Sequence, residues 1–268
     1  MGPVEVRGCA FYVEVLGEGP PVLLIPPSGS TPSTWGLLPD ELAETRRVIV
    51  YDRRGYTRSG GQTVRSAAVH AADAAALLEA LQARPAVVVG TSSGATIALD
   101  LAVRRPDLVS AVVSHEAPWR ALAHPDPSAL ATLARLGWEV SRGHYDRATE
   151  VLLRFVYGYQ DGGTAWDAFP EQWRATAMEN GRQVIADLVA TMRSYPSAAD
   201  LGFVEVPVVC SYGARSRPFM QAITRSLAEA IPAAELREID AAAHAVPFDN
   251  PHAFAEVVLA AVGASRAS

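Results

Sequence analysis

The chain has 268 residues, of which 49% are hydrophobic and 19% are charged, as in an ordinary globular protein. Its formal net charge of −6 opposes binding to nucleic acid or to an anionic membrane, because both partners need a basic face. No apolar run approaches the roughly 20 residues that span a bilayer, and the N-terminus lacks the basic and apolar regions of a signal peptide, so a cytoplasmic location is expected.

The chain contains two cysteines, Cys9 and Cys210. Their number and spacing match neither a disulfide framework nor a zinc site. Two free, buried thiols in a reducing compartment are therefore favoured over a single disulfide.

Short apolar runs rich in Val and Ile alternate with helical segments, a pattern that predicts a mostly parallel sheet with helices on both faces. The first two runs, residues 4–6 and 10–16, predict an antiparallel hairpin. Six further runs complete a predicted sheet of eight strands, at residues 22–26, 47–52, 86–90, 108–116, 206–213 and 235–240. Helices are predicted at residues 35–44, 66–82, 94–104, 218–230 and 251–262.

The alternation of strands and helices stops once, between residues 117 and 205, where only helical patterns occur. This stretch is rich in aromatic residues, namely Trp119, Trp138, Phe155, Tyr157, Tyr159, Trp166, Phe169, Trp173 and Tyr195. An extra helical bundle with its own small core explains any one of them, but as a set they favour a lid whose underside lines an apolar pocket. We therefore expect residues 1–116 and 206–268 to form one core and residues 117–205 to form an inserted helical lid.

The segment Gly90-Thr91-Ser92-Ser93-Gly94 has the pattern G-x-S-x-G, which by itself often occurs by chance. Here it follows a predicted buried strand directly and precedes a predicted helix, which is the context of a nucleophile elbow. The flanking glycines allow the tight turn, and the helix N-terminus points free amides at developing negative charge. Ser92 is therefore the predicted nucleophile.

A serine hydroxyl needs a general base at neutral pH. Of the six histidines, His244 is placed best, because it follows the last predicted strand and precedes the final helix. The other five are interpreted as surface or packing residues: His70, His115, His124, His144 and His252.

The acid that orients such a histidine usually follows the seventh strand, but Ser216 stands where an aspartate is expected. Glu116 ends the sixth predicted strand, one strand nearer the nucleophile, a shift of about 4.8 Å. A carboxylate there is costly to bury without a partner, so Glu116 is the predicted acid. The alternatives are that Glu116 pairs with Arg120, or that Asp240 or Asp249, which flank His244, supplies the acid.

Acyl transfer also needs two backbone donors for the oxyanion of the tetrahedral intermediate. The amide of Ser93, the residue after the nucleophile, is one predicted donor. The second should come from the loop after the third strand, where Pro26 and Pro27 have no N–H. Ser28 is the first residue of that loop that can donate, so its amide is the second predicted donor.

These motifs resemble the α/β-hydrolase superfamily along nearly the whole chain. Within it, the sequence is similar to the fungal zearalenone lactonases in five segments: LIPPSG, GTSSGAT, SHEAPW, GGTAW and AAAHAVPFDNPHAFAEVV. The resemblance implies a triad of Ser92, Glu116 and His244, with an oxyanion donor at Ser28. The tryptophan that packs on the lactone in that family falls near Val184 in this chain, and Pro27-Ser28 replaces an Asp-Gly pair.

The sequence therefore predicts a serine hydrolase that cleaves a small apolar carboxylic ester or lactone. Perhydrolase chemistry and lyase chemistry on the same triad are alternatives. No metal or cofactor is expected for this reaction. Lyases of this fold resemble the chain but use a lysine in the lid, and the chain has no lysine. A non-catalytic ligand receptor is the remaining alternative, which the intact set of Ser, His and carboxylate opposes.

Overall fold

The computed structural model describes residues 3–193, 196–232 and 234–264. A seven-stranded sheet has the order β3-β5-β4-β6-β7-β8-β9, in which only β3 is antiparallel to its neighbour. Its strands are β3 (Val13–Leu16), β4 (Pro21–Ile25), β5 (Arg47–Tyr51), β6 (Ala86–Thr91), β7 (Val109–His115), β8 (Val208–Gly213) and β9 (Ala234–Ile239). The predicted mostly parallel α/β fold is confirmed.

The predicted count of eight strands in one sheet is wrong. The strand expected at residues 10–16 is interrupted at Tyr12, whose amide donates to the Ser59 hydroxyl at 3.0 Å rather than to a strand. The half before the break, β2 (Cys9–Phe11), pairs with β1 (Val4–Val6) in a separate two-stranded sheet. Only the half after the break, β3, joins the main sheet.

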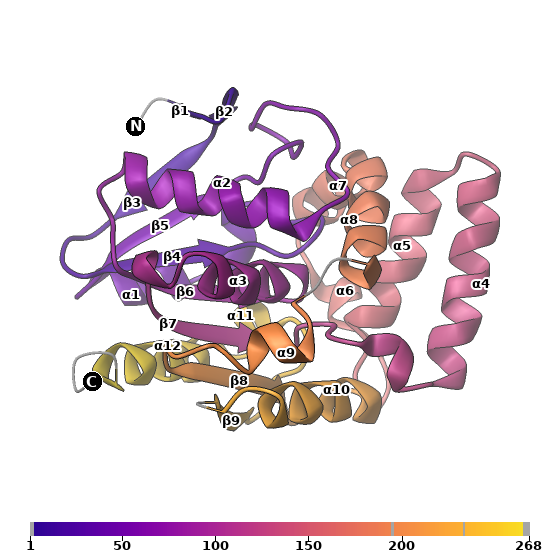
Figure 1. Cartoon of the computed structure of the whole chain (residues 1–268). Coiled ribbons are helices and arrows are strands. Elements are labelled where there is room, and N and C mark those ends of the chain that lie inside the picture. Colours follow the sequence, from indigo (N-terminus) through magenta and orange to yellow (C-terminus); the bar gives the residue numbers. More distant parts are fainter. Residues whose placement is uncertain (1–2, 194–195, 233, 265–268) are drawn as a thin grey trace.

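Helices cover both faces of the main sheet (Figure 1). On one face lie α2 (Ala67–Ala80), α3 (Ser93–Arg104) and α10 (Pro218–Glu229), and on the other lie α1 (Leu38–Ala43) and α12 (Pro251–Ala264). Alternate residues of a strand enter different cores, so Leu23 packs with the first face and Leu24 with the second. Cys9 and Cys210 are both free and buried, as predicted.

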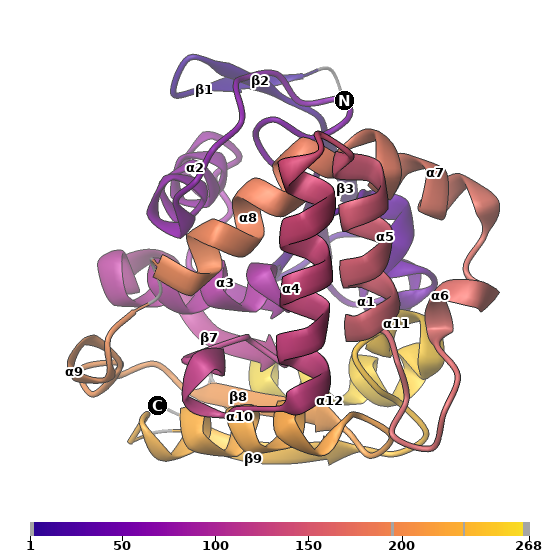
Figure 2. The same cartoon turned by 90° about the vertical axis from the view of Figure 1, so that its right-hand side faces the viewer.

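The described residues between β7 and β8 include six α-helices, of which the first five lie to one side of the sheet and the sixth packs near α3 (Figures 1 and 2). They are α4 (Pro127–Ser141), α5 (Tyr145–Val156), α6 (Ala165–Ala168), α7 (Glu171–Glu179), α8 (Gly181–Arg193) and α9 (Ala198–Leu201). Short elements complete the described chain, namely α11 (Val246–Asp249) and the 3-10 turns Pro32–Trp35, Pro106–Leu108 and Ala121–Ala123. No helix of the described residues is long and apolar enough to cross a membrane.

The turn between β6 and α3 packs so closely that only glycine fits beside it. A Cβ atom on Gly90 would lie 2.3 Å from the carbonyl oxygen of Gly94. One on Gly94 would lie 2.2 Å from the carbonyl oxygen of Ile25, the last residue of β4. The two glycines therefore bring the start of α3 against both its own strand and the neighbouring strand.

We predict that Gly94→Ala lowers the free energy of unfolding by about 1–3 kcal/mol, because the new methyl group must push the end of β4 away. The matched control is Gly137→Ala within α4, where a Cβ meets nothing within 4 Å. There alanine should leave stability unchanged or raise it by up to about 1 kcal/mol through helix propensity. Urea unfolding of the two variants measures both values, and equal effects would contradict this account of the turn.

Candidate active site

Ser92 lies at the junction of β6 and α3 in a strained backbone conformation. Its φ and ψ angles are 53° and −124°, a region that residues other than glycine rarely adopt. The strain is held by hydrogen bonds on both sides, since the Ser92 amide donates to the carbonyl of His115 at 2.9 Å and its own carbonyl accepts from Ala95. The predicted strand-to-helix context of Ser92 is thus observed.

His244 and Glu116 are joined by a buried hydrogen bond. Nδ1 of His244 lies 2.8 Å from Oε2 of Glu116, which follows β7 with a left-handed φ of 47°. The second carboxylate oxygen accepts from the Gly213 amide at 3.1 Å and from the Ser216 hydroxyl. Ser216, at the position where an aspartate was expected, therefore supports the carboxylate that arrives from the neighbouring strand.

The alternative partners considered for this site have other contacts. Asp249 accepts hydrogen bonds from the Ala243 amide and the Tyr159 hydroxyl, both at 2.8 Å, and Asp240 is exposed. The guanidinium of Arg120 lies over the ring of Trp119, 5.4 Å from its centre. Of these carboxylates, Glu116 is the one in contact with His244.

Burial would raise the pKa of Glu116, but the hydrogen bond from His244 and the nearby His115 ring together lower this pKa to about 2. The pKa of His115 is lowered to about 4, chiefly by burial, so this histidine is neutral at pH 7. Its Nε2 lies 3.1 Å from the carbonyl oxygen of Ala243, which can only accept, so Nε2 carries the proton. His115, expected only to pack, thus holds the residue that precedes His244.

Ser28 and Ser93 meet at the start of α3. Their hydroxyl oxygens lie 2.9 Å apart. Among the described residues, neither backbone amide donates to a backbone acceptor. Two free amides on adjoining segments are the arrangement that can hold an oxyanion.

A cavity of about 170 Å³ lies between the sheet and the inserted helices. Ser92, Ser93, Glu116 and His244 line it on the side of the sheet. Most of the remaining wall is apolar and comes from α5, α8 and α10, including Leu152, Phe155, Val156, Val184, Leu188, Met192, Phe219, Met220 and Ile223. Within the described residues no hydrogen bond joins Ser92 to His244, and such contacts are often long before a substrate binds.

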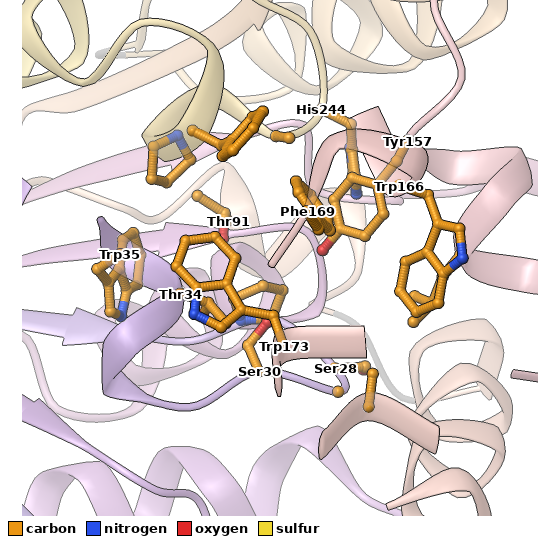
Figure 3. A pocket seen from close by; sticks show the side chains of 17 residues that line it. Ser28, Ser30, Thr34, Trp35, Thr91, Tyr157, Trp166, Phe169, Trp173 and His244 are labelled. Atoms are coloured by element: carbon orange, nitrogen blue, oxygen red, sulfur yellow. The ribbon is translucent and has the colours of Figure 1, made fainter. Parts of the chain in front are cut away.

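A second, smaller cavity of about 40 Å³ also reaches Ser28 and His244 (Figure 3). Aromatic side chains dominate its lining, and among them Phe169 packs edge-on against both Tyr157 and Trp166 (Figure 3). The ring of Tyr157 lies 5.6 Å from the imidazole, between ring centres. Not all the aromatic residues of the segment 117–205 line a cavity. Trp119 is buried in the main core, and Trp138 is 61% exposed. Tyr195 lies outside the described residues.

One buried ion pair beside the site was missed at the level of sequence. Asp187 of α8 and Arg53 of the loop after β5 are each 2% exposed, and their side chains meet at 2.5 Å. The only signal in the sequence was a lone carboxylate in the apolar pattern of residues 181–193, which indicates a buried charge that needs a partner.

Comparison with known proteins agrees with the fold and with the hydrolase class. A model of the alpha/beta hydrolase family matches residues 22–257. An uncharacterized hydrolase, YraK of Bacillus subtilis, is 36% identical over 121 residues, which span 43% of this chain and 44% of that protein. A non-heme chloroperoxidase of Streptomyces lividans is 27% identical over 230 residues, 82% of this chain and 83% of that protein. The solved structure of Est816, described as an N-acyl homoserine lactone degrading enzyme, has a TM-score of 0.78 at 25% identity, covering 96% of this chain and 99% of that chain.

The lowered pKa of Glu116 predicts how stability depends on pH. A carboxyl whose pKa falls on folding stabilises the protein above its unfolded pKa of about 4.3, and this contribution is lost as the pH falls toward 2. The free energy of unfolding of the wild type should fall between pH 4 and pH 2.5. In Glu116→Gln this slope should be smaller by up to about 1.4 kcal/mol per pH unit, the effect of one proton. Urea unfolding across this range measures it, and parallel curves for the two proteins would be inconsistent with an ionised Glu116.

Proposed function

Since this chain belongs to the alpha/beta hydrolase family, we propose that it cleaves a carboxylic ester or lactone through a covalent acyl-enzyme on Ser92. The observation that carries the proposal is the 2.8 Å contact of Glu116 with His244, in a cavity that Ser92 also lines. An ionised carboxylate on Nδ1 fixes the imidazole with Nε2 free to accept a proton. Est816, which degrades lactones according to its description, supports this class of substrate.

In the first half of the reaction, Ser92 Oγ attacks the carbonyl carbon of the substrate while His244 Nε2 accepts the hydroxyl proton. The charge on the imidazolium is balanced by Glu116. The oxyanion that forms on the carbonyl oxygen is bound by the amides of Ser28 and Ser93. When the C–O bond breaks, His244 returns the proton to the leaving alkoxide.

In the second half, His244 removes a proton from water, which attacks the ester that joins the acyl group to Ser92. The same two amides bind the second oxyanion. Its collapse releases the carboxylic acid and restores the Ser92 hydroxyl with the proton held by His244. In a lactone the alcohol and the acid leave as one open-chain product.

The apolar wall of the larger cavity supports an apolar acyl group, and a macrolactone of the zearalenone type is the finer form of this proposal. Val184 lies in that wall, where it leaves more room than a tryptophan would. We also propose that residues 117–205 act as the lid over the core formed by residues 1–116 and 206–268. The cytoplasmic location inferred from the sequence stays a prediction.

Ser92→Ala should lower turnover of esters and lactones by about 10⁶-fold, because the variant lacks the hydroxyl on which the proposed acyl-enzyme forms. Hydrolysis of a panel of aryl esters, small lactones and macrolactones, read by mass spectrometry, measures this loss. Labelling with a fluorophosphonate probe should mark Ser92 in the wild type and vanish in the variant. Full activity of Ser92→Ala would refute the assignment of the nucleophile.

Glu116→Gln should lower turnover by about 10⁴-fold, because an amide keeps the shape of the carboxylate but cannot balance the imidazolium. Asp249→Asn is the matched control, since Asp249 holds Ala243 and Tyr159 rather than His244. Asp249→Asn should lower turnover by less than about 10-fold, and Asp240→Asn should lower it by less still. Steady-state kinetics rank the three variants, and the reverse ranking would move the acid to Asp249 or Asp240.

Perhydrolase chemistry is the second candidate function. It is favoured by the similarity to a non-heme chloroperoxidase over 82% of this chain. In that reaction hydrogen peroxide, rather than water, would attack the acyl-enzyme on Ser92 and yield a peroxyacid. Peroxide-dependent halogenation of a dye in the presence of a short carboxylic acid separates the two, since a simple hydrolase leaves the dye unchanged.

A further inference from the structure

The loop that carries Ser28 is held to the protein by its side chains. In the described part of the chain, residues 26–30 form no backbone-to-backbone hydrogen bond. Pro26 and Pro27 cannot donate one, and Gly29 has a left-handed φ of 79°. Something else must fix the Ser28 amide, because a donor in an oxyanion hole has to be in place before the reaction begins.

The Ser28 hydroxyl supplies that anchor through a directed chain of hydrogen bonds. It donates to Oδ2 of Asp187 at 2.9 Å, which uses its single proton. The Ser93 hydroxyl, 2.9 Å away, must therefore donate to Ser28, and it accepts in turn from Arg53 at 3.5 Å. The two proposed oxyanion residues are thus tied to each other and to one carboxylate.

Asp187 is itself fixed by several contacts from other segments. Its Oδ2 also accepts from the Tyr56 hydroxyl at 2.6 Å and from Arg53 at 2.5 Å, and its Oδ1 accepts from Gln183 at 2.8 Å. His70 Nε2 lies 3.5 Å from Oδ1. A carboxylate with this many partners has one available position.

The Arg53 guanidinium balances the charge of Asp187. A lone buried carboxylate so close to Ser28 and Ser93 would repel the oxyanion. Burial opposes the charge, but Arg53 holds the pKa of Asp187 far below its usual range. The ion pair therefore positions the hydroxyls without adding net negative charge beside the site.

We propose that Asp187 is a positioning residue that, through the hydroxyls of Ser28 and Ser93, sets the spacing of the two oxyanion amides. This proposal rests on the proposed hydrolase function. Because Asp187 belongs to α8, the inserted helices contribute to transition-state binding as well as to the wall of the cavity. Packing agrees with this link, since a Cβ built on Gly29 would lie 3.3 Å from both Ala177 of α7 and Val184 of α8.

The test uses Ser28→Ala, which removes the hydroxyl and keeps the amide. With p-nitrophenyl butyrate, kcat should fall by about 10- to 100-fold, part of the loss seen when a donor is removed altogether, while KM changes less than about threefold. Affinity for a trifluoromethyl ketone, which forms a tetrahedral adduct on Ser92, should fall in parallel with kcat/KM. The matched control is Ser33→Ala, whose exposed hydroxyl contacts Thr31 instead, and it should behave as wild type.

A double-mutant cycle tests the role of Asp187 directly. Asp187→Ala should lower kcat in the wild-type background. It should have at least fivefold less effect on kcat when Ser28 is already alanine, because both substitutions remove the same Ser28–Asp187 hydrogen bond. If Arg53 without its partner prevents folding, the pair Arg53→Met and Asp187→Leu removes both charges and serves in the same cycle.

The outcomes separate this proposal from the hydrolase function. An active wild-type enzyme with a Ser28→Ala variant of unchanged kcat, a loss confined to KM, or strictly additive effects in the cycle would overturn the role of Asp187 alone. A wild-type protein that hydrolyses no ester or lactone and does not label at Ser92 would overturn both.

Discussion

The close approach of α3 to the strands beneath it is the constraint on which the site depends. Gly94 lies so near the end of β4 that no side chain fits between them, and Gly90 is equally restricted against Gly94. The first turn of α3, which follows the positive φ of Ser92, therefore lies beside the loop that follows Ile25. This packing places the proposed nucleophile and the Ser93 amide beside the loop of Ser28. The Ser28 amide itself is then fixed by the side-chain contact with Asp187.

The strand order explains how a carboxylate from β7 serves the histidine. β7 lies between β6 and β8, so Glu116 leaves the sheet between the turn that carries Ser92 and the loop that carries Ser216. From there one carboxylate oxygen contacts His244 and the other accepts from Ser216 and Gly213. The serine cannot replace an acid, but its hydroxyl gives the buried carboxylate a further hydrogen bond beside that of the Gly213 amide.

Sequence patterns predicted the elements that depend on local or nearest-strand information. The Val-rich strands, the glycine-flanked turn at Ser92 and the placement of Glu116 one strand from the expected acid all follow from order along the chain. The interruption of the strand at Tyr12 could not be predicted in this way, because it depends on the Ser59 hydroxyl from a distant loop. The lone carboxylate at Asp187 indicated a buried charge, but its partners could not be predicted, because they come from separate segments of the chain.

The two buried carboxylates beside the site differ in the partner that balances each charge. Glu116 is paired with His244, the proposed general base, whose side chain can take up and release a proton. Asp187 is paired with an arginine, which stays protonated under all ordinary conditions. If a histidine alone balanced Asp187, a change of its protonation would leave a net negative charge next to the oxyanion amides. Arginine removes this coupling, and His70, whose pKa is lowered by burial, stands beside the pair without being needed for its charge. The proposed general base and the proposed positioning residue are therefore electrostatically separate, although both lie within the same site.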